Sequence, residues 1–244
     1  MRLWLRLAAV AVLLTVPAMA AAQDITLSLG DEGSISARSI QLILLLTVLS
    51  LAPGLAIMIT CFPFLVTVLA ILRQAIGLQQ SPPNMLIVSL ALFLTYFVME
   101  PVFTAAWETG IRPLIDNDLP VDIAMTRALE PFREFMAARV DPDTFRAMAE
   151  LRPDAATLEP TPEANLSVLI PSFLLSEISR AFQIGFLVFL PFLIIDLVVA
   201  AILMSMGMMM VPPAIVSLPF KLAFFVVADG WSLIASALVR SYYP

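Results

Sequence analysis

Four charged side chains lie within apolar stretches of the C-terminal half of the chain, where an ionised group could pair, relay a proton or bind an ion: Glu177, Arg180, Asp196 and Lys221. A charge that faces lipid without a partner is costly, so each of them needs a counter-charge or water. Glu177 and Arg180 are three residues apart, which on a helix allows a local ion pair; the alternative is a bridge to a neighbouring subunit. Asp196 is either a proton-relay carboxylate or a structural anchor opposite Lys221, and we favour the anchor.

The residue types that most covalent catalysis requires are missing from the sequence. There is no histidine, and Cys61 is the only cysteine, which excludes His/Cys metal sites, Ser–His–Asp and Cys–His catalysis, and a disulfide within the chain. No G-x-x-x-x-G-K-[ST] phosphate loop occurs either. We therefore expect a protein that is not an enzyme, with no catalytic residue, metal or cofactor. Cys61, in the apolar run MITCFPFL, is predicted to be a small buried hydrophobic residue.

A cluster of methionines occupies the stretch SMGMMMVPP, residues 205–213. Methionine has flexible torsions and a polarisable sulfur, so it can fill an irregular core or line a soft apolar constriction. Gly207 allows the backbone to bend, while Pro212 and Pro213 are expected to fix the start of the next helix. From these residues alone, both core packing and a constriction stay open.

The chain is more apolar than a soluble domain. Of its 244 residues, 61% are hydrophobic and only 13% are charged, and its mean hydropathy is +0.98, so a bilayer or a large assembly must cover the excess apolar surface. Long stretches without Asp, Glu, Lys or Arg lie between residues 38 and 73, 73 and 100, 180 and 196, and 196 and 221. They predict an all-α membrane protein in which one helical hairpin precedes a polar middle and a second hairpin follows it. No nucleic-acid partner is expected.

Prolines are expected to interrupt or kink these helices. In the first stretch, Pro53-Gly54 and Pro63 predict a short helix, a break and a longer helix, and the second stretch is expected to begin after Ser81-Pro82-Pro83 and to end near Glu100-Pro101. Broken helices at membrane depth are tolerated only where protein or a water-lined cavity covers the freed carbonyls, which favours a packed oligomer with an aqueous path. Further interruptions are predicted at Pro171, Pro191, Pro212, Pro213 and Pro219.

The polar middle, residues 108–165, carries twelve acidic residues and six arginines, which accounts for the whole formal net charge of −6. Apolar residues at helical spacing in VDIAMTRALEPFREFMAARV predict an amphipathic helix, and DPDTFRAMAEL predicts a capped helix with Pro142 in its first turn. Residues 152–162, with three prolines, are expected to form a linker. We expect the segment to lie outside the bilayer, either as a solvated spacer or as a docking surface.

The N-terminus, residues 1–22, is predicted to be a secretory signal peptide. Two arginines precede a short apolar run, and small residues follow it, so cleavage is expected near Ala20, Ala21 and Ala22. The alternative is an uncleaved first membrane helix. The rest of the chain is then expected to form a first hairpin (23–107), the acidic segment (108–165) on the periplasmic side, and a second hairpin (166–244).

The order of Asp, Gly, Met and Pro in FQIGFLVFLPFLIIDLVVAAILMSMGMMMVPP resembles the FliP family of flagellar export-gate proteins, whose virulence-secretion relatives are called SctR. The run PFLVTVLAILRQAIGLQQSPPNMLIVSLALFLTYFVMEP is similar to the family's first hairpin. The resemblance implies a pore-forming subunit of the flagellar type III protein export gate, which passes unfolded flagellar subunits across the bacterial inner membrane at the flagellar basal body. It also implies a helical oligomeric pore of about five copies with FliQ-like and FliR-like subunits and other export-apparatus and basal-body proteins.

A methionine-rich loop narrows the pore in that family. The resemblance therefore implies that Pro212 and Pro213 form the helix break beyond a gate made of Met204, Met206, Gly207, Met208, Met209 and Met210. The four charges named above are then expected to hold helices or neighbouring subunits in register. Two other functions stay open, a virulence-type secretion gate and an ion-coupled secondary transporter that uses Asp196 and Glu177.

Overall fold

The computed structural model describes residues 35–78, 82–152, 159–208 and 210–243. The predicted signal peptide, with Ala20, Ala21 and Ala22, lies outside these residues, as does most of the predicted linker. All secondary structure in the described ranges is helical, which confirms the all-α prediction. The chain divides into two compact units, residues 1–48 and 49–244.

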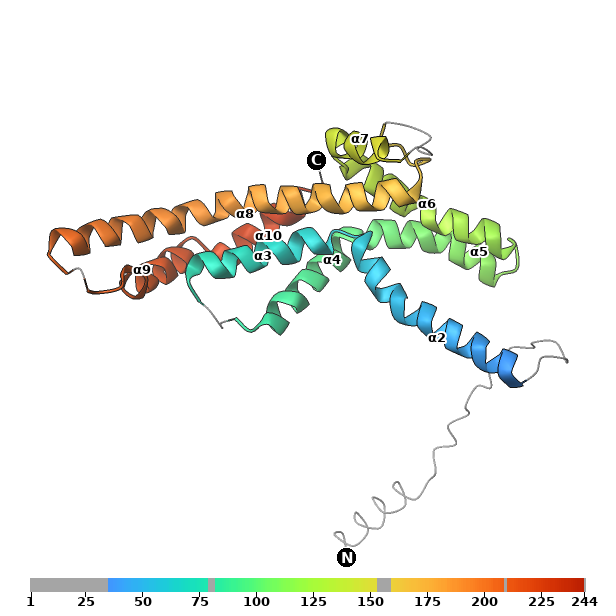
Figure 1. Cartoon of the computed structure of the whole chain (residues 1–244), viewed down its shortest axis with the longest axis horizontal. Coiled ribbons are helices and arrows are strands. Elements are labelled where there is room, and N and C mark those ends of the chain that lie inside the picture. Colours follow the sequence, from blue (N-terminus) through green and yellow to red (C-terminus); the bar gives the residue numbers. More distant parts are fainter. Residues whose placement is uncertain (1–34, 79–81, 153–158, 209, 244) are drawn as a thin grey trace, which may run out of the picture. The chain divides into compact units, whose positions relative to one another are not determined.

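Figure 1 labels the α-helices. In chain order they are α2 (Ile35–Met58), α3 (Phe62–Ile76), α4 (Asn84–Ala106), the π-helical turn η1 (Trp107–Ile111), α5 (Arg112–Ile115), α6 (Val121–Arg139), α7 (Pro142–Glu150), α8 (Leu166–Ser205), α9 (Pro213–Val227) and α10 (Gly230–Arg240). Three stretches are long and apolar enough to cross a membrane, and the bent pair of α9 and α10 passes the same test together. The three are Ser39–Met58, Asn84–Ile115 and Leu166–Ser205.

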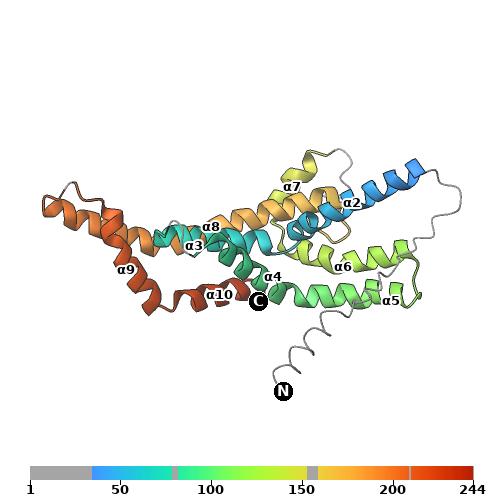
Figure 2. The same cartoon turned by 90° about the horizontal axis from the view of Figure 1, so that it is seen from below.

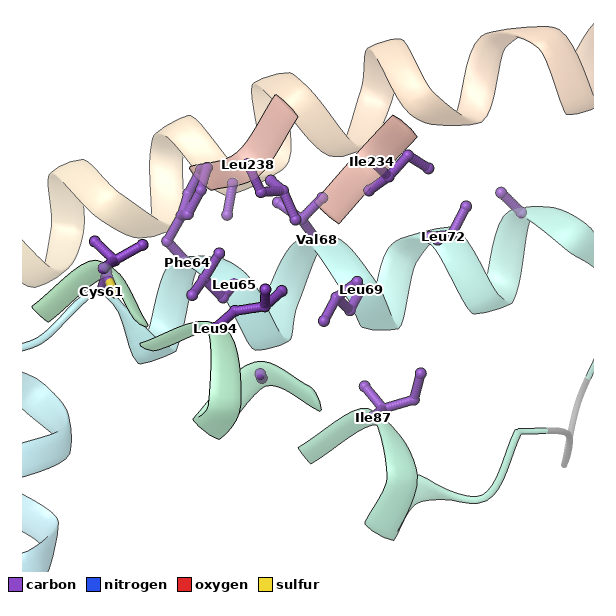
Figure 3. Packing of buried hydrophobic residues seen from close by; sticks show 14 of the residues in the cluster. Cys61, Phe64, Leu65, Val68, Leu69, Leu72, Ile87, Leu94, Ile234 and Leu238 are labelled. Atoms are coloured by element: carbon purple, nitrogen blue, oxygen red, sulfur yellow. The ribbon is translucent and has the colours of Figure 1, made fainter. Parts of the chain in front are cut away.

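Helix α3 is the buried centre of the unit 49–244. Its apolar side chains lie on several faces of the helix, and α4, α8, α9 and α10 pack around it. Figure 3 shows the α3 side chains beside Ile87 and Leu94 of α4 and Ile234 and Leu238 of α10. Because burial of one such side chain contributes about 1.5–3 kcal/mol, this cluster fixes the neighbouring helices on α3. Its buried α3 members are Phe64, Leu65, Val68, Leu69, Leu72, Ala75 and Ile76. Cys61, at the start of α3, is fully buried as predicted.

The prolines of the first half interrupt the helices less than the sequence predicts. α2 runs through Pro53 and Gly54, so the predicted break there is wrong, and a longer helix precedes a shorter one rather than the reverse. The break falls at residues 59–61 instead. Pro63 lies in the first turn of α3, where no backbone donor is needed. α4 begins at Asn84 as expected but continues through Pro101, past its predicted end.

The second half shows the same pattern. α8 is one continuous helix of 40 residues that contains Pro171 and Pro191, and Pro219 lies inside α9. Of the two predicted effects of these prolines, a kink or an end, none of the three therefore produces a helix end. Pro213 does begin α9. The 61° bend between α9 and α10 follows Val227 and includes Asp229, whose φ is +46°, rather than a proline; Figure 2 shows this bend.

The acidic segment forms the two predicted amphipathic helices. α6 packs along α4, η1 and α8, and buries Met136. α7 begins at Pro142, and the Asp141 carboxylate caps it by accepting a hydrogen bond from the Thr144 backbone N–H at 2.8 Å. That hydrogen bond holds the pKa of Asp141 below its ordinary value, because it stabilises the ionised form.

Gly110 allows the backbone of η1 to pack directly against the backbone of α6. A Cβ atom at this position would lie 2.6 Å from the Ala128 backbone nitrogen and 2.7 Å from the Ala124 carbonyl oxygen. Real Cβ atoms essentially never come so close, so only glycine fits here without a backbone shift.

We predict that Gly110→Ala destabilises the protein by about 1–3 kcal/mol, the usual cost of overpacking. Gly54→Ala is the matched control, because Gly54 is also helical and a Cβ there would meet nothing within 4 Å. Alanine also favours the helix over glycine by about 1 kcal/mol, so the control should be neutral or stabilised. Thermal unfolding of the chain in mild detergent compares the two, and a Gly110→Ala variant as stable as the control would contradict the close approach.

Candidate functional site: paired charges and an exposed methionine loop

Asp196 and Lys221 form an ion pair between α8 and α9. Lys221 Nζ lies 2.6 Å from Asp196 Oδ2 and also donates to the Ala75 carbonyl near the end of α3, at 3.1 Å. Ser217, one turn before Lys221, donates to Asp196 Oδ1 at 2.6 Å. The pair therefore joins three helices. Since both carboxylate oxygens of Asp196 are engaged, the geometry favours the anchor over a proton relay.

Glu177 of α8 is fully buried, and its nearest cation is not the one that the sequence predicts. Arg139 of α6 places Nη2 at 3.2 Å from Glu177 Oε1, and its Nε donates to the same oxygen at 3.3 Å. Arg180 lies farther away, at 3.8 Å, and its side chain is more exposed. The Tyr242 hydroxyl donates to Oε2. These four residues are called the Glu177 network; the predicted local pair exists in it, but Arg139 is the closer, buried partner.

The Glu177 network also fixes the end of the chain. Arg139 donates to the Ser241 carbonyl at 2.8 Å, and its guanidinium lies over the Tyr242 ring, 4.0 Å from the ring centre. The same ring stacks on Phe135 of α6 at a centroid distance of 6.1 Å. Burial, followed by the charge of Glu177, raises the pKa of Tyr242, so its hydroxyl stays protonated and remains a donor.

Sequence reasoning missed Arg139 and Tyr242. Arg139 belongs to the acidic segment, 38 residues before Glu177, and Tyr242 follows Glu177 by 65 residues. One signal could have found Arg139: it lies one turn after Phe135 and Met136, on the apolar face of α6, where a cation needs a buried partner.

The methionine loop, residues 204–210, is exposed in the chain. The exposed fractions are 61% for Met204, 65% for Met206, 37% for Met208 and 97% for Met210, whereas Met209 lies outside the described residues. These four methionines therefore do not fill a core within one chain. Clustered exposed apolar side chains are typical of a surface that meets a partner, a ligand or a membrane.

The backbone fixes both ends of this loop. α8 ends in a Schellman motif, in which the Met208 N–H donates to the Leu203 carbonyl and the Gly207 N–H donates to the Met204 carbonyl, both at 3.0 Å. Gly207 has φ +76°, a conformation that glycine adopts without strain. Beyond the loop, α9 begins at Pro213. An open apolar groove of about 500 Å³ lies between α8 and α9 next to the loop, and Val198, Ile202, Met206, Val216 and Phe220 help to line it.

Residues 45–238 match the model of the FliP family. The flagellar biosynthetic protein FliP of Caulobacter vibrioides is 50% identical over 230 residues, which cover 93% of this chain and 85% of that protein. The protein of the same name from Agrobacterium fabrum is 45% identical over 240 residues, with 97% and 98% covered. That of Bacillus subtilis is 45% identical over 219 residues, with 88% and 96% covered.

We predict that Arg139→Gln destabilises the protein far more than Arg180→Gln. Loss of Arg139, whose side chain is 15% exposed, removes the closest cation from a buried carboxylate, which typically costs about 3–5 kcal/mol. Arg180 is 36% exposed and more distant, so its loss should cost about 1 kcal/mol or less. Thermal unfolding in detergent measures both, and equal losses would contradict the larger contribution of Arg139.

The Asp196–Lys221 pair predicts a strong coupling between two substitutions. Asp196→Asn and Lys221→Gln each leave one charge without its partner, whereas the double variant leaves none. The double variant should therefore lose less stability than the two single variants added together, by about 1–3 kcal/mol. Additive losses in the same unfolding assay would argue against a direct pair.

Proposed function

The chain belongs to the FliP family, and from that membership and its exposed methionine loop we propose that it is a pore-forming subunit of the flagellar type III protein export gate. Relatives that cover most of the chain are named flagellar biosynthetic proteins. In this proposal, unfolded flagellar subunits cross the inner membrane through an opening that several copies of the chain surround. The observation that carries the proposal is the exposure of the methionines at the turn between α8 and α9. Figure 1 shows where these two helices meet.

The methionine loop acts as the seal. A secretion pore must pass chains of many sequences, yet it must hold back ions when it is idle. Methionine side chains are apolar and flexible, so a ring of them excludes water when closed and adapts to varied cargo when open. In one chain these side chains are exposed by 37–97%, which leaves them available to meet the same residues of other copies.

Ion-pair and hydrogen-bond contacts join α3, α8 and α9 into a rigid frame that supports the methionine loop. The Asp196–Lys221 pair and the Ser217 hydrogen bond hold α9 against α8, and the Lys221 contact with the Ala75 carbonyl holds both against α3. Because the Schellman motif at Gly207 then sets the direction of the loop, each copy presents its methionines in the same way. The intrachain charges thus set the register of the helices around the gate.

The assembly combines about five copies with FliQ-like and FliR-like subunits, at the flagellar basal body in the inner membrane. The exposed apolar side chains of α2, α4 and α8 support a membrane or partner environment, since three stretches of these helices are long and apolar enough to span a bilayer. The acidic segment, α6 and α7, lies on the periplasmic side in this proposal.

The other two functions have less support. The named relatives are flagellar proteins, which favours a flagellar gate over a virulence-type gate. A secondary transporter needs coupling carboxylates that ions can reach. Glu177 has no exposed area. The Asp196 side chain is 34% exposed, but its two carboxylate oxygens already accept from Ser217 and Lys221, which favours a structural role over an ion site.

Replacement of Met208, Met209 and Met210 together by alanine tests the seal. Small-ion leakage across the membrane of intact cells should rise several-fold, because alanine cannot reach across the opening, while the complex still assembles. Met85→Ala is the control, since Met85 is 76% exposed but lies at the start of α4. An assembled triple variant that leaks no more than this control would show that the methionines are packing and not a seal.

A further inference from the structure

Glu100 is an exposed carboxylate within the apolar helical run Asn84–Ile115. The four charges named above within apolar helices each have an ion-pair partner: Glu177, Arg180, Asp196 and Lys221. The Glu100 side chain has no hydrogen bond or ion pair with the residues that the structure describes. A lone charge in apolar surroundings is costly, so we expect Glu100 to have a counter-charge from outside the chain.

Aromatic side chains surround this carboxylate. Glu100 lies in a cleft of about 450 Å³ that Tyr96, Phe97 and Tyr243 also line. Residues 96, 97 and 100 share one side of α4 by their helical spacing, and Tyr96 stacks on Phe103 at a centroid distance of 6.5 Å. An ionised carboxylate beside aromatic faces is a combination that binds an ammonium or guanidinium group, through charge and through cation–π attraction.

The cleft is formed before any partner arrives. Pro101 has no N–H, so the Phe97 carbonyl, four residues earlier, lacks its usual helical donor. The Tyr243 hydroxyl donates to this carbonyl at 3.3 Å and to the Val98 carbonyl at 3.1 Å. These bonds hold Tyr243 in place as one wall of the cleft. A preformed wall favours binding because less freedom is lost when a partner side chain enters.

We propose that this cleft binds a lysine or arginine side chain of a different polypeptide in the export gate, an inference that rests on the proposed function for the existence of that assembly. Aromatic anchors around a central charge are typical of the energetic centre of a protein interface. A second copy of this chain is a poor source of the cation, because it brings a net charge of −6. In addition, most of its described cationic side chains are already engaged within the chain: Arg73, Arg112, Arg133, Arg139, Arg146, Arg180 and Lys221.

The test uses the full chain expressed with the other proteins of the export gate. Glu100→Lys should reduce the yield of the mixed complex, measured by native mass spectrometry in mild detergent, by tenfold or more, and Glu100→Gln should reduce it less. Glu130→Lys is the matched control, an exposed carboxylate on α6 away from the cleft. A photoreactive phenylalanine analogue at position 97 should crosslink to a different polypeptide at a peptide that contains lysine or arginine, and Glu100→Gln should weaken this crosslink.

Other outcomes overturn the inference. A mixed complex that tolerates Glu100→Lys as well as Glu130→Lys, without a crosslink from position 97, shows that no partner occupies the cleft. A crosslink to an aminophospholipid, with the complex intact, assigns the site to a lipid headgroup. If Glu100→Lys also lowers the unfolding temperature of the isolated chain, its loss of complex does not test the cleft. The crosslink from position 97 in the Glu100→Gln chain then tests it, and a crosslink as strong as in the wild-type chain overturns the inference. A wild-type chain that forms no mixed complex at all contradicts the proposed function itself, which is a distinct result.

Discussion

An ionised group that leaves water must find an opposite charge, and this constraint organises the chain around the long helix α8. Glu177, in the first half of α8, is fully buried and holds Arg139 of α6 and the hydroxyl of Tyr242. Asp196, in the second half, holds Lys221 of α9. The acidic segment, the C-terminus and the α8–α9 turn are therefore tied to one helix through two carboxylates. Each tie is costly to break, because it would leave a charge without its partner.

The frame and the methionine loop differ in the kind of interaction that holds them. The frame is held by directional ion pairs and by the close packing of α3, which permit little movement. Met204, Met206, Met208 and Met210 at the α8–α9 turn have exposed side chains, which form no hydrogen bond or ion pair with the residues that the structure describes. A fixed frame that carries flexible methionine side chains suits a pore that closes tightly yet passes many different sequences, since only those side chains need to move.

The sequence predicts the fold well where hydrophobic pattern and local caps decide it, and less well where tertiary contacts do. The start of α4 after Pro83, the cap of α7 at Asp141 and the all-α architecture follow from local signals. The predicted break at Pro53 and the predicted end of α4 near Pro101 are wrong because a proline removes only one donor, which a distant side chain can replace, as Tyr243 does beside Pro101. Asp196 and Lys221 could be paired from sequence because they lie on successive helices, whereas Arg139 and Tyr242 reach Glu177 only through long-range packing.

The central claim is that the methionine loops of several copies meet at one opening, and a single cysteine tests it most directly. Cys61 is fully buried, and burial raises the pKa of its thiol to about 12, so in a Met210→Cys chain the introduced thiol is the reactive one. The account predicts that a short bis-maleimide joins two copies in the idle membrane complex, and that a stalled export substrate in the pore prevents this crosslink. Copies that stay single, and that react fully with a bulky maleimide in the idle complex, would contradict it.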